Sequence, residues 1–149
     1  MQIRSGDKFV ASRLFAVAPA VPSLFVDTGG TGGNSFFPGI ALNPAGSKNS
    51  DDHPAAPGDW ITLFVNGAAA LTGAKVTATL GVTILESEPL APWPGIEIPL
   101  NQVRVRLPQT LSSGIRALPL TLSIDGIPAG PFVYFNQVYQ SGALIWAGQ

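Results

Sequence analysis

Short segments in which apolar and polar residues alternate recur along the chain, separated by Gly, Pro, Asn and Asp. Residues 101–107 (NQVRVRL) and 74–80 (AKVTATL) alternate most regularly, with the two-residue period of a β-strand. The inward positions are predicted to be Val103, Val105 and Leu107 in the first segment and Val76, Ala78 and Leu80 in the second. No segment sustains the 3.6-residue apolar spacing of an amphipathic helix, so the pattern predicts an all-β protein.

Seven further segments have the composition of strands. They are residues 8–17, 36–42, 59–65, 82–85, 118–124, 131–139 and 143–146. Asp125-Gly126 follows one of them and predicts a two-residue hairpin turn. Residues 27–35 and 43–58 are rich in Gly, Pro, Asn and Asp, and are predicted to be surface loops. Seven to nine short antiparallel strands at turn spacings of about 8 to 12 residues are typical of a β-sandwich, here in one domain spanning residues 1–149.

Composition agrees with this class. The 149 residues include 17 glycines and 14 prolines, which suit the many turns of an antiparallel protein and disfavour long helices. Hydrophobic residues make up 46%, enough for a buried core, whereas charged residues make up only 11%. A surface with so few charges favours an extracellular module over a cytosolic enzyme. The chain has no cysteine, which excludes disulfides, cysteine zinc sites and thiol catalysis.

Charge and hydropathy narrow the possible partners. The net charge is −1 and there is no basic run, so nucleic-acid binding is not expected. No stretch of 18 or more apolar residues occurs, and the sequence predicts no membrane span. The apolar residues 14–24 are interrupted by Pro19 and Pro22, and they are not predicted to be a signal peptide.

The order of strand and turn motifs resembles a known domain family. The matching stretches are residues 15–25 (FAVAPAVPSLF), 41–65 (ending in PGDWITLFV), the turn Asn66-Gly67, residues 101–108 (NQVRVRLP), Ser113-Gly114 and residues 120–126 (LTLSIDG). In this order they are similar to the uncharacterised Solibacter-type C-terminal domain of large secreted bacterial proteins, which is related to the IPT/TIG branch of immunoglobulin-like folds. The resemblance covers roughly residues 15–134. It implies an immunoglobulin-like β-sandwich and an extracellular or cell-surface location, and it supplies no catalytic residues or cofactor.

Candidate catalytic and metal-binding residues are few. Asp51, Asp52 and His53 are the only place where an imidazole adjoins carboxylates, but a single histidine lacks the nitrogen partners of a zinc site. A solvated loop is therefore the favoured interpretation. Asp27 and Asp59 flank neighbouring loops and would add oxygen ligands for calcium, although no Asp-x-Asp-x-Asp-Gly series is present. No metal or other cofactor is expected.

Glu86 and Glu88 are two residues apart, and on a strand they would share one face. Paired carboxylates serve glycoside hydrolysis, and clustering with Glu97 in a deep cleft would favour an enzyme. An exposed pair in a proline-rich segment is the favoured alternative, and the sequence predicts no enzymatic activity.

Two of the three tryptophans are stronger candidates for binding. Trp93 lies in Pro-Trp-Pro-Gly, a segment unlike a core strand, and an exposed indole there would stack on a sugar ring or anchor a partner. Trp146 and Tyr139 are candidates to join it. Folding of Trp93 back over the edge of the core is the favoured alternative, while Trp60, on the strand at residues 59–65, is predicted to be in the core.

The sequence thus predicts a non-catalytic structural or interaction module of a secreted or cell-surface bacterial protein. Its expected partners are other protein domains or subunits, reached through strand edges such as that of residues 8–17. The alternative function is a carbohydrate-binding module that uses Trp93, Trp146 and Tyr139 to hold a polysaccharide.

Overall fold

The computed structural model describes residues 2–5, 8–12, 20–27, 37–95, 100–111, 114, 116–130, 132–134, 137–139 and 142–148, and for 2–5, 8–12, 132–134 and 137–139 it describes the backbone alone. This part of the chain is all-β, with one short 3-10 helix. The elements are β1 (Gln2–Ser5), β2 (Lys8–Ser12), β3 (Ser23–Leu24), β4 (Ala41–Leu42), β5 (Trp60–Asn66), η1 (Ala69–Leu71), β6 (Val76–Leu80), β7 (Thr83–Ser87), β8 (Ala91–Pro92), β9 (Asn101–Arg106), β10 (Arg116–Ile124), β11 (Ile127–Pro128), β12 (Phe132–Tyr134), β13 (Gln137–Tyr139) and β14 (Ala143–Ala147).

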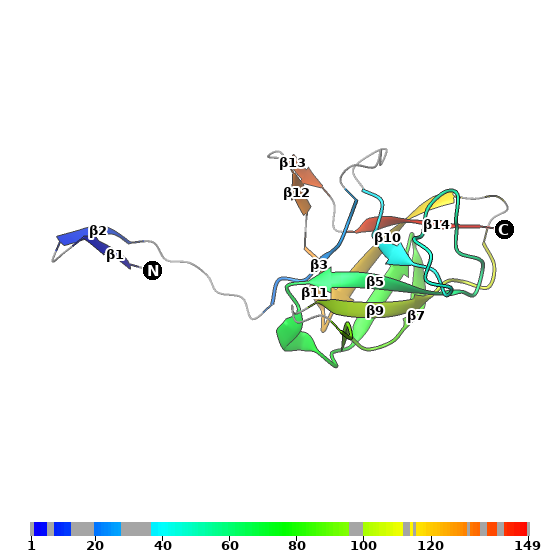
Figure 1. Ribbon diagram of the computed structural model, residues 1–149, viewed down its shortest axis with the longest axis horizontal. Helices are drawn as coiled ribbons and strands as arrows, with labels where there is room; N and C mark the ends of the chain where they lie inside the picture. Colours follow the sequence, from blue (N-terminus) through cyan, green and yellow to red (C-terminus); the bar gives the residue numbers. More distant parts are fainter. Residues whose placement is uncertain are drawn as a thin grey trace.

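Ten of these strands form one antiparallel sheet that curls into a half-barrel (Figure 1). Its order is β11-β10-β6-β7-β9-β5-β3, and β14, β4 and β8 pair with β10, β5 and β9 respectively. β1 pairs with β2, and β12 with β13, as separate two-stranded sheets. The strands in the described part outnumber the predicted seven to nine for three reasons. Four of them have only two residues, too few for alternation to reveal; β1 was not predicted; and the predicted strand at residues 131–139 contains both β12 and β13.

The sheet changes direction at β7. Its first residues, Thr83 to Leu85, pair with β6, whereas Glu86 and Ser87 pair with β9. One strand thus passes from one neighbour to the other, and the sheet curls at this point into its half-barrel.

The segment of residues 37–55 connects the two ends of the curl. β4 lies within it and pairs with β5. Pro38 and Ala55 form parallel bridges to Leu144 and Ala147 on β14. The last strand therefore has neighbours on both sides, and it does not present a free edge to another chain.

The hydrophobic core fills this interior. The alternation of β9 and β6 is confirmed, because their predicted inward side chains are all 6% exposed or less. β5 adds Ile61, Leu63 and Val65, and the opposite wall adds Leu120 and Ile145. Each fully buried aliphatic side chain of this kind contributes about 1.5 to 3 kcal/mol to stability.

Two predictions from the sequence need correction here. Trp60 is not in the core: it is half-buried on the outer face of β5, because the inward positions of that strand begin at Ile61. Residues 43–58 form a loop, but it is not wholly on the surface, since Asn49 and Ala55 are 2% and 0% exposed. The predicted strand at residues 8–17 is described as β2 for residues 8–12, and its remainder lies outside the described residues.

The predicted hairpin at Asp125-Gly126 is confirmed. Ile124 pairs with Ile127 on either side of the two-residue turn. Asp125 and Gly126 both have positive φ, 47° and 78°, which are the signs of a type I′ turn. The Asp125 carboxylate also accepts a hydrogen bond of 3.0 Å from the backbone N–H of Lys75, which ties the turn to the start of β6.

Asp125→Ala is expected to lower the free energy of unfolding by about 1 to 2 kcal/mol, because it removes that acceptor and places Ala at positive φ. Asp125→Asn is the matched control: asparagine tolerates positive φ and keeps a side-chain oxygen, so its loss is expected to be less than half as large. Urea unfolding followed by circular dichroism measures both. Equal losses would mean that the bond to Lys75 and the turn conformation have no part in stability.

Candidate functional site

A cluster of apolar side chains lies on the outer face of β5 and β9, away from the core. Phe64 of β5 and Trp93, which follows β8, meet edge to face with ring centroids 4.9 Å apart and an interplanar angle of 75°. Phe25, Ile40 and Leu100 complete the lining of a hollow of about 250 Å³. These five residues are termed the aromatic patch.

Backbone pairing explains why the aromatic patch faces outward. On β5, Leu63 and Val65 are buried, so the intervening Phe64 points to the other side of the sheet. The backbone N–H of Phe25 donates to the carbonyl of Phe64 at 3.0 Å, which holds Phe25 beside β5. The N–H of Trp93 donates to the carbonyl of Leu100 at 2.8 Å, which fixes Trp93 against the start of β9.

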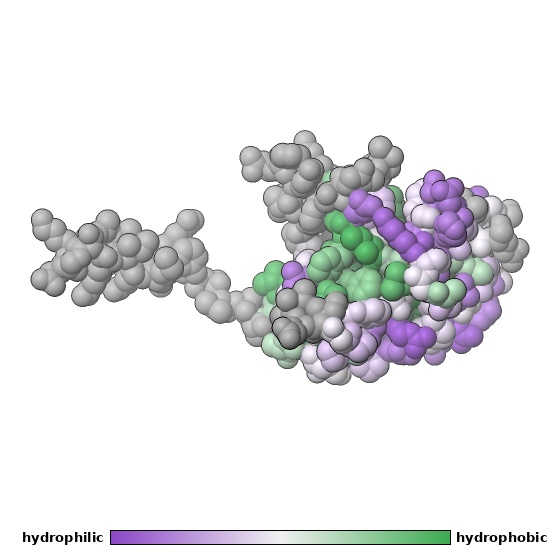
Figure 2. All heavy atoms as spheres, viewed as in Figure 1, coloured by the Kyte–Doolittle hydropathy of each residue, from purple (hydrophilic) through white to green (hydrophobic). Residues whose placement is uncertain are grey.

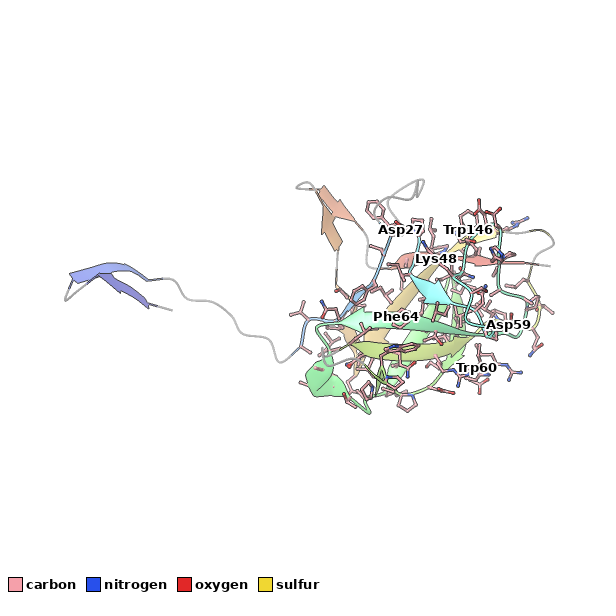
Figure 3. The ribbon with its side chains drawn as sticks, in the orientation of Figure 1. Asp27, Lys48, Asp59, Trp60, Phe64 and Trp146 are labelled. Atoms are coloured by element: carbon pink, nitrogen blue, oxygen red, sulfur yellow. The ribbon has the colours of Figure 1, made fainter. Side chains whose placement is uncertain are left out.

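The patch is open to solvent on one side and bordered by charge. Phe25 is 38% exposed, and Figure 2 shows hydrophobic residues gathered at the centre of this face with hydrophilic residues around them. Asp27, two residues after Phe25, carries a 2.7 Å ion pair to Lys48, and Figure 3 shows both above Phe64. A cluster that is apolar at its centre with polar surroundings is typical of an interaction surface.

Farther along the same face, β9 carries a row of arginines. The Arg104 guanidinium lies 5.3 Å from the centre of the Trp60 ring and pairs with Glu88 at 2.8 Å. Arg106 pairs with Glu86 at 3.4 Å. These exposed pairs contribute about 1 kcal/mol or less each, so they mainly fix the arrangement of side chains beside the patch.

The structure separates the predicted binding residues. Trp93 belongs to the aromatic patch and is half-buried. Trp146 lies on β14, in the opposite wall of the curl, and Figure 3 draws it well away from Phe64. Tyr139 ends β13, for which the backbone alone is described. The neighbours that Trp93 does have, above all Phe64, were not predicted, although the outward position of Phe64 follows from the alternation of β5.

The predicted acidic sites are dispersed in the described part of the chain, where no three His, Asp or Glu side chains are grouped to hold a metal ion. The Asp51 carboxylate accepts the backbone N–H of Asp52 at 3.1 Å, and that of Asp59 accepts the N–H of Ala56 at 2.9 Å. His53 is exposed. Glu86 and Glu88 engage separate arginines, and Glu97 lies outside the described residues.

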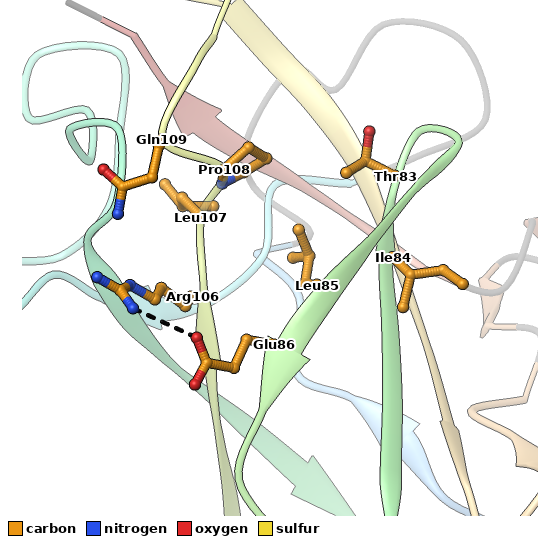
Figure 4. Close-up of a pocket in the computed structure, with 8 residues that line it drawn as sticks. All are labelled: Thr83, Ile84, Leu85, Glu86, Arg106, Leu107, Pro108 and Gln109. Atoms are coloured by element: carbon orange, nitrogen blue, oxygen red, sulfur yellow. Dashed lines mark hydrogen bonds and ion pairs between the residues drawn. The ribbon is translucent and has the colours of Figure 1, made fainter.

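A second hollow lies where β7 diverges from β9. Figure 4 shows the side chains of β7 on one side and those of residues 106–109 on the other, with the Glu86–Arg106 ion pair across the gap. Because the two opposite charges lie within this hollow, it carries no net charge of its own.

Comparison of the chain with protein-family models, with curated proteins and with solved structures found no match. The class that the structure itself defines is an all-β protein with a ten-stranded antiparallel half-barrel. Among the described residues, no helix has the length and apolar character needed to cross a lipid bilayer.

Proposed function

We propose that this protein is a non-catalytic interaction module of a secreted or cell-surface bacterial protein, and that the aromatic patch binds apolar side chains of a protein partner. The observation that carries the proposal is the edge-to-face pair of Phe64 and Trp93 on the outer face of a sheet whose core lies on the other side. Large aromatic side chains dominate the energetics of protein interfaces. The predicted carboxylate pair offers no competing site, because each glutamate is engaged by an arginine of β9.

The proposed architecture is an immunoglobulin-like sandwich, as the resemblance to the Solibacter-type domain implies. Strand pairing supports it. The series β3/β4-β5-β9-β7 follows the A-B-E-D order of the first immunoglobulin sheet, and β7-β6-β10-β14 follows C′-C-F-G of the second. In this proposal β7 supplies both C′ and D. A crystal structure with two facing layers about 10 Å apart would agree with it, whereas a single open sheet would contradict it.

The strand edges are the weaker candidate for assembly. The last strand, β14, lies between β10 and the segment of residues 37–55. β1, at the other end of the chain, pairs with β2 in a separate two-stranded sheet, so each has one strand partner in the described part of the chain. Edge pairing through β1 or β2 is therefore the second candidate for assembly.

Carbohydrate binding is the alternative. A sugar stacks on the flat face of an aromatic ring and needs polar groups nearby for its hydroxyls. In the patch, the two rings meet at 75°, and apart from the indole N–H the lining side chains are hydrocarbon. These features favour an apolar protein side chain as the occupant over a sugar ring.

A peptide-display library, panned on wild-type protein and on Trp93→Ala, tests the proposal. Wild-type protein is expected to enrich peptides rich in Trp, Phe and Leu, and enrichment is expected to fall at least about tenfold on Trp93→Ala. Val82→Ala is the matched control, because Val82 is 100% exposed and lies outside the patch. It is expected to retain wild-type enrichment.

A glycan array run with the same three proteins separates the two functions. Glycan binding that disappears in Trp93→Ala would replace the proposed function with carbohydrate recognition. Peptide enrichment that is equal on wild-type protein and on Trp93→Ala would show that the aromatic patch is not the binding surface. Circular dichroism of each variant establishes that it is folded.

A further inference from the structure

A third hollow, distinct from the aromatic patch, lies at the end of the half-barrel where β6 ends and β10 begins. Its volume is about 290 Å³. Leu80, Leu111 and Leu118 supply an aliphatic floor, while Thr83, Thr110 and Arg116 supply the polar groups. Aliphatic surface combined with a few polar groups is the composition of small-molecule sites, and the volume is at the small end of their range.

The charge of this hollow is unbalanced. Among the described residues that line it, Arg116, at the start of β10, is the only charged one. Within the described part of the chain no carboxylate pairs with Arg116, whereas Arg104 and Arg106 each pair with a glutamate. The neighbouring hollow in Figure 4 differs in charge. The two hollows share Thr83 and Pro108, but in the hollow of Figure 4 the carboxylate of Glu86 neutralises Arg106.

We propose that this hollow binds a carboxylate that carries a short apolar chain. The guanidinium of Arg116 matches the two oxygens of a carboxylate in a planar, bidentate arrangement. The hydroxyls of Thr83 and Thr110 are further donors at the same rim, and the leucine side chains receive the apolar chain. This ligand chemistry is shared by a free short-chain carboxylic acid and by the C-terminal residue of a protein that ends in an apolar side chain.

The aromatic patch and the hollow at Arg116 favour different ligands. The aromatic patch offers hydrocarbon and no cation in its lining, so it does not select for a carboxylate. Binding at Arg116 therefore stands or falls independently of the proposed interaction through Trp93.

Titration of 15N-labelled protein with hexanoate, followed by NMR, tests the proposal, with N-acetyl-Gly-Leu as a probe for chain-terminal carboxylates. Either probe is expected to shift the amide signals of Thr83, Thr110 and Arg116. Tighter binding of hexanoate identifies a free acid as the source, and tighter binding of the peptide identifies a chain terminus. Hexylamine, with the same chain and the opposite charge, is expected not to bind.

Arg116→Gln is expected to weaken binding of the better probe at least about tenfold. Lys75→Gln is the matched control, because Lys75 is exposed, has no ion pair in the described part of the chain and does not line this hollow. It is expected to bind as wild type does. The proposal is overturned by unchanged affinity in Arg116→Gln, by equal binding of hexylamine or inorganic phosphate, or by the absence of shifts at a probe concentration of about 10 mM, roughly ten times a dissociation constant of 1 mM.

Discussion

Asn49→Ala is expected to lower the free energy of unfolding by about 2 to 4 kcal/mol, although residue 49 lies in a polar loop. The side chain is 2% exposed and acts as a strand neighbour for β14. Its amide nitrogen donates to the carbonyl of Trp146 at 2.8 Å, and its oxygen accepts the backbone N–H of Trp146 at 2.8 Å. The same nitrogen also donates to the Asn43 side-chain oxygen at 3.0 Å.

Alanine would leave the backbone N–H of Trp146 without its acceptor, and a buried group of this kind costs about 1 to 3 kcal/mol. The carbonyl of Trp146 would lose one of two donors, because it also accepts the N–H of Ala55 at 3.0 Å. Asn49→Asp is expected to be nearly as damaging, because a carboxylate has no N–H and would face the carbonyl of Trp146. Chemical denaturation measures both variants, with Asn43→Ala as a milder comparison, since its bonds to Ser47 and His53 are exposed and its bond to Asn49 is only partly buried. A loss below 1 kcal/mol in Asn49→Ala would mean that this loop does not help to hold β14.

Gly67→Ala is expected to lower the free energy of unfolding by about 2 to 4 kcal/mol, because two unfavourable effects add. Gly67 has a φ of +69°, where an L-residue pays roughly 1 to 2 kcal/mol. A Cβ at this position would also overlap the backbone carbonyl of Val21. The segment at Val21 cannot easily move, because its N–H donates to the carbonyl of Gly67 at 3.0 Å and the next carbonyl, of Pro22, accepts the N–H of Gly130 at 2.7 Å.

Gly73→Ala is the control that separates these effects. Gly73 has a φ of +84°, but an added Cβ would meet no atom within 4 Å. Gly73→Ala is therefore expected to lower the free energy of unfolding only through the strain of an L-residue at positive φ, by roughly 1 to 2 kcal/mol. Thermal and urea unfolding of the two variants give the comparison. If Gly73→Ala proved as destabilising as Gly67→Ala, the close contact with Val21 would have no role.

The parts of the fold that could be predicted from the sequence are those determined by residues close together along the chain. Alternation along residues 101–107 identified both a strand and its buried face, since a one-residue shift would expose every aliphatic side chain. The turn at Asp125-Gly126 was predictable because few residues adopt positive φ at two successive positions. Asn49 could not be recognised as a core residue, because its partner, Trp146, is 97 positions away along the chain.

The candidate site was predictable only in part, because its residues come from distant positions along the chain. Trp93 was identified as an aromatic residue outside the core strands, and this rested on the prolines and glycine around it. Its surroundings come from four other positions, 25, 40, 64 and 100, that no local pattern connects. Trp60 was misplaced because an aromatic residue on a strong strand is expected inside, whereas here Arg104 covers one side of its ring on the outer face.

The central claim is that the aromatic patch binds a protein partner, and NMR titration of 15N-labelled protein with an enriched display peptide tests it most directly. The predicted result is that the backbone signals of Phe25, Ile40, Phe64 and Leu100, together with the indole N–H of Trp93, shift in a saturable manner. Trp93→Ala is expected to abolish these shifts, and Val82→Ala to leave them unchanged. Shifts centred instead on Trp146 and the other residues of β14, with no change at Phe64 or Trp93, would contradict the claim.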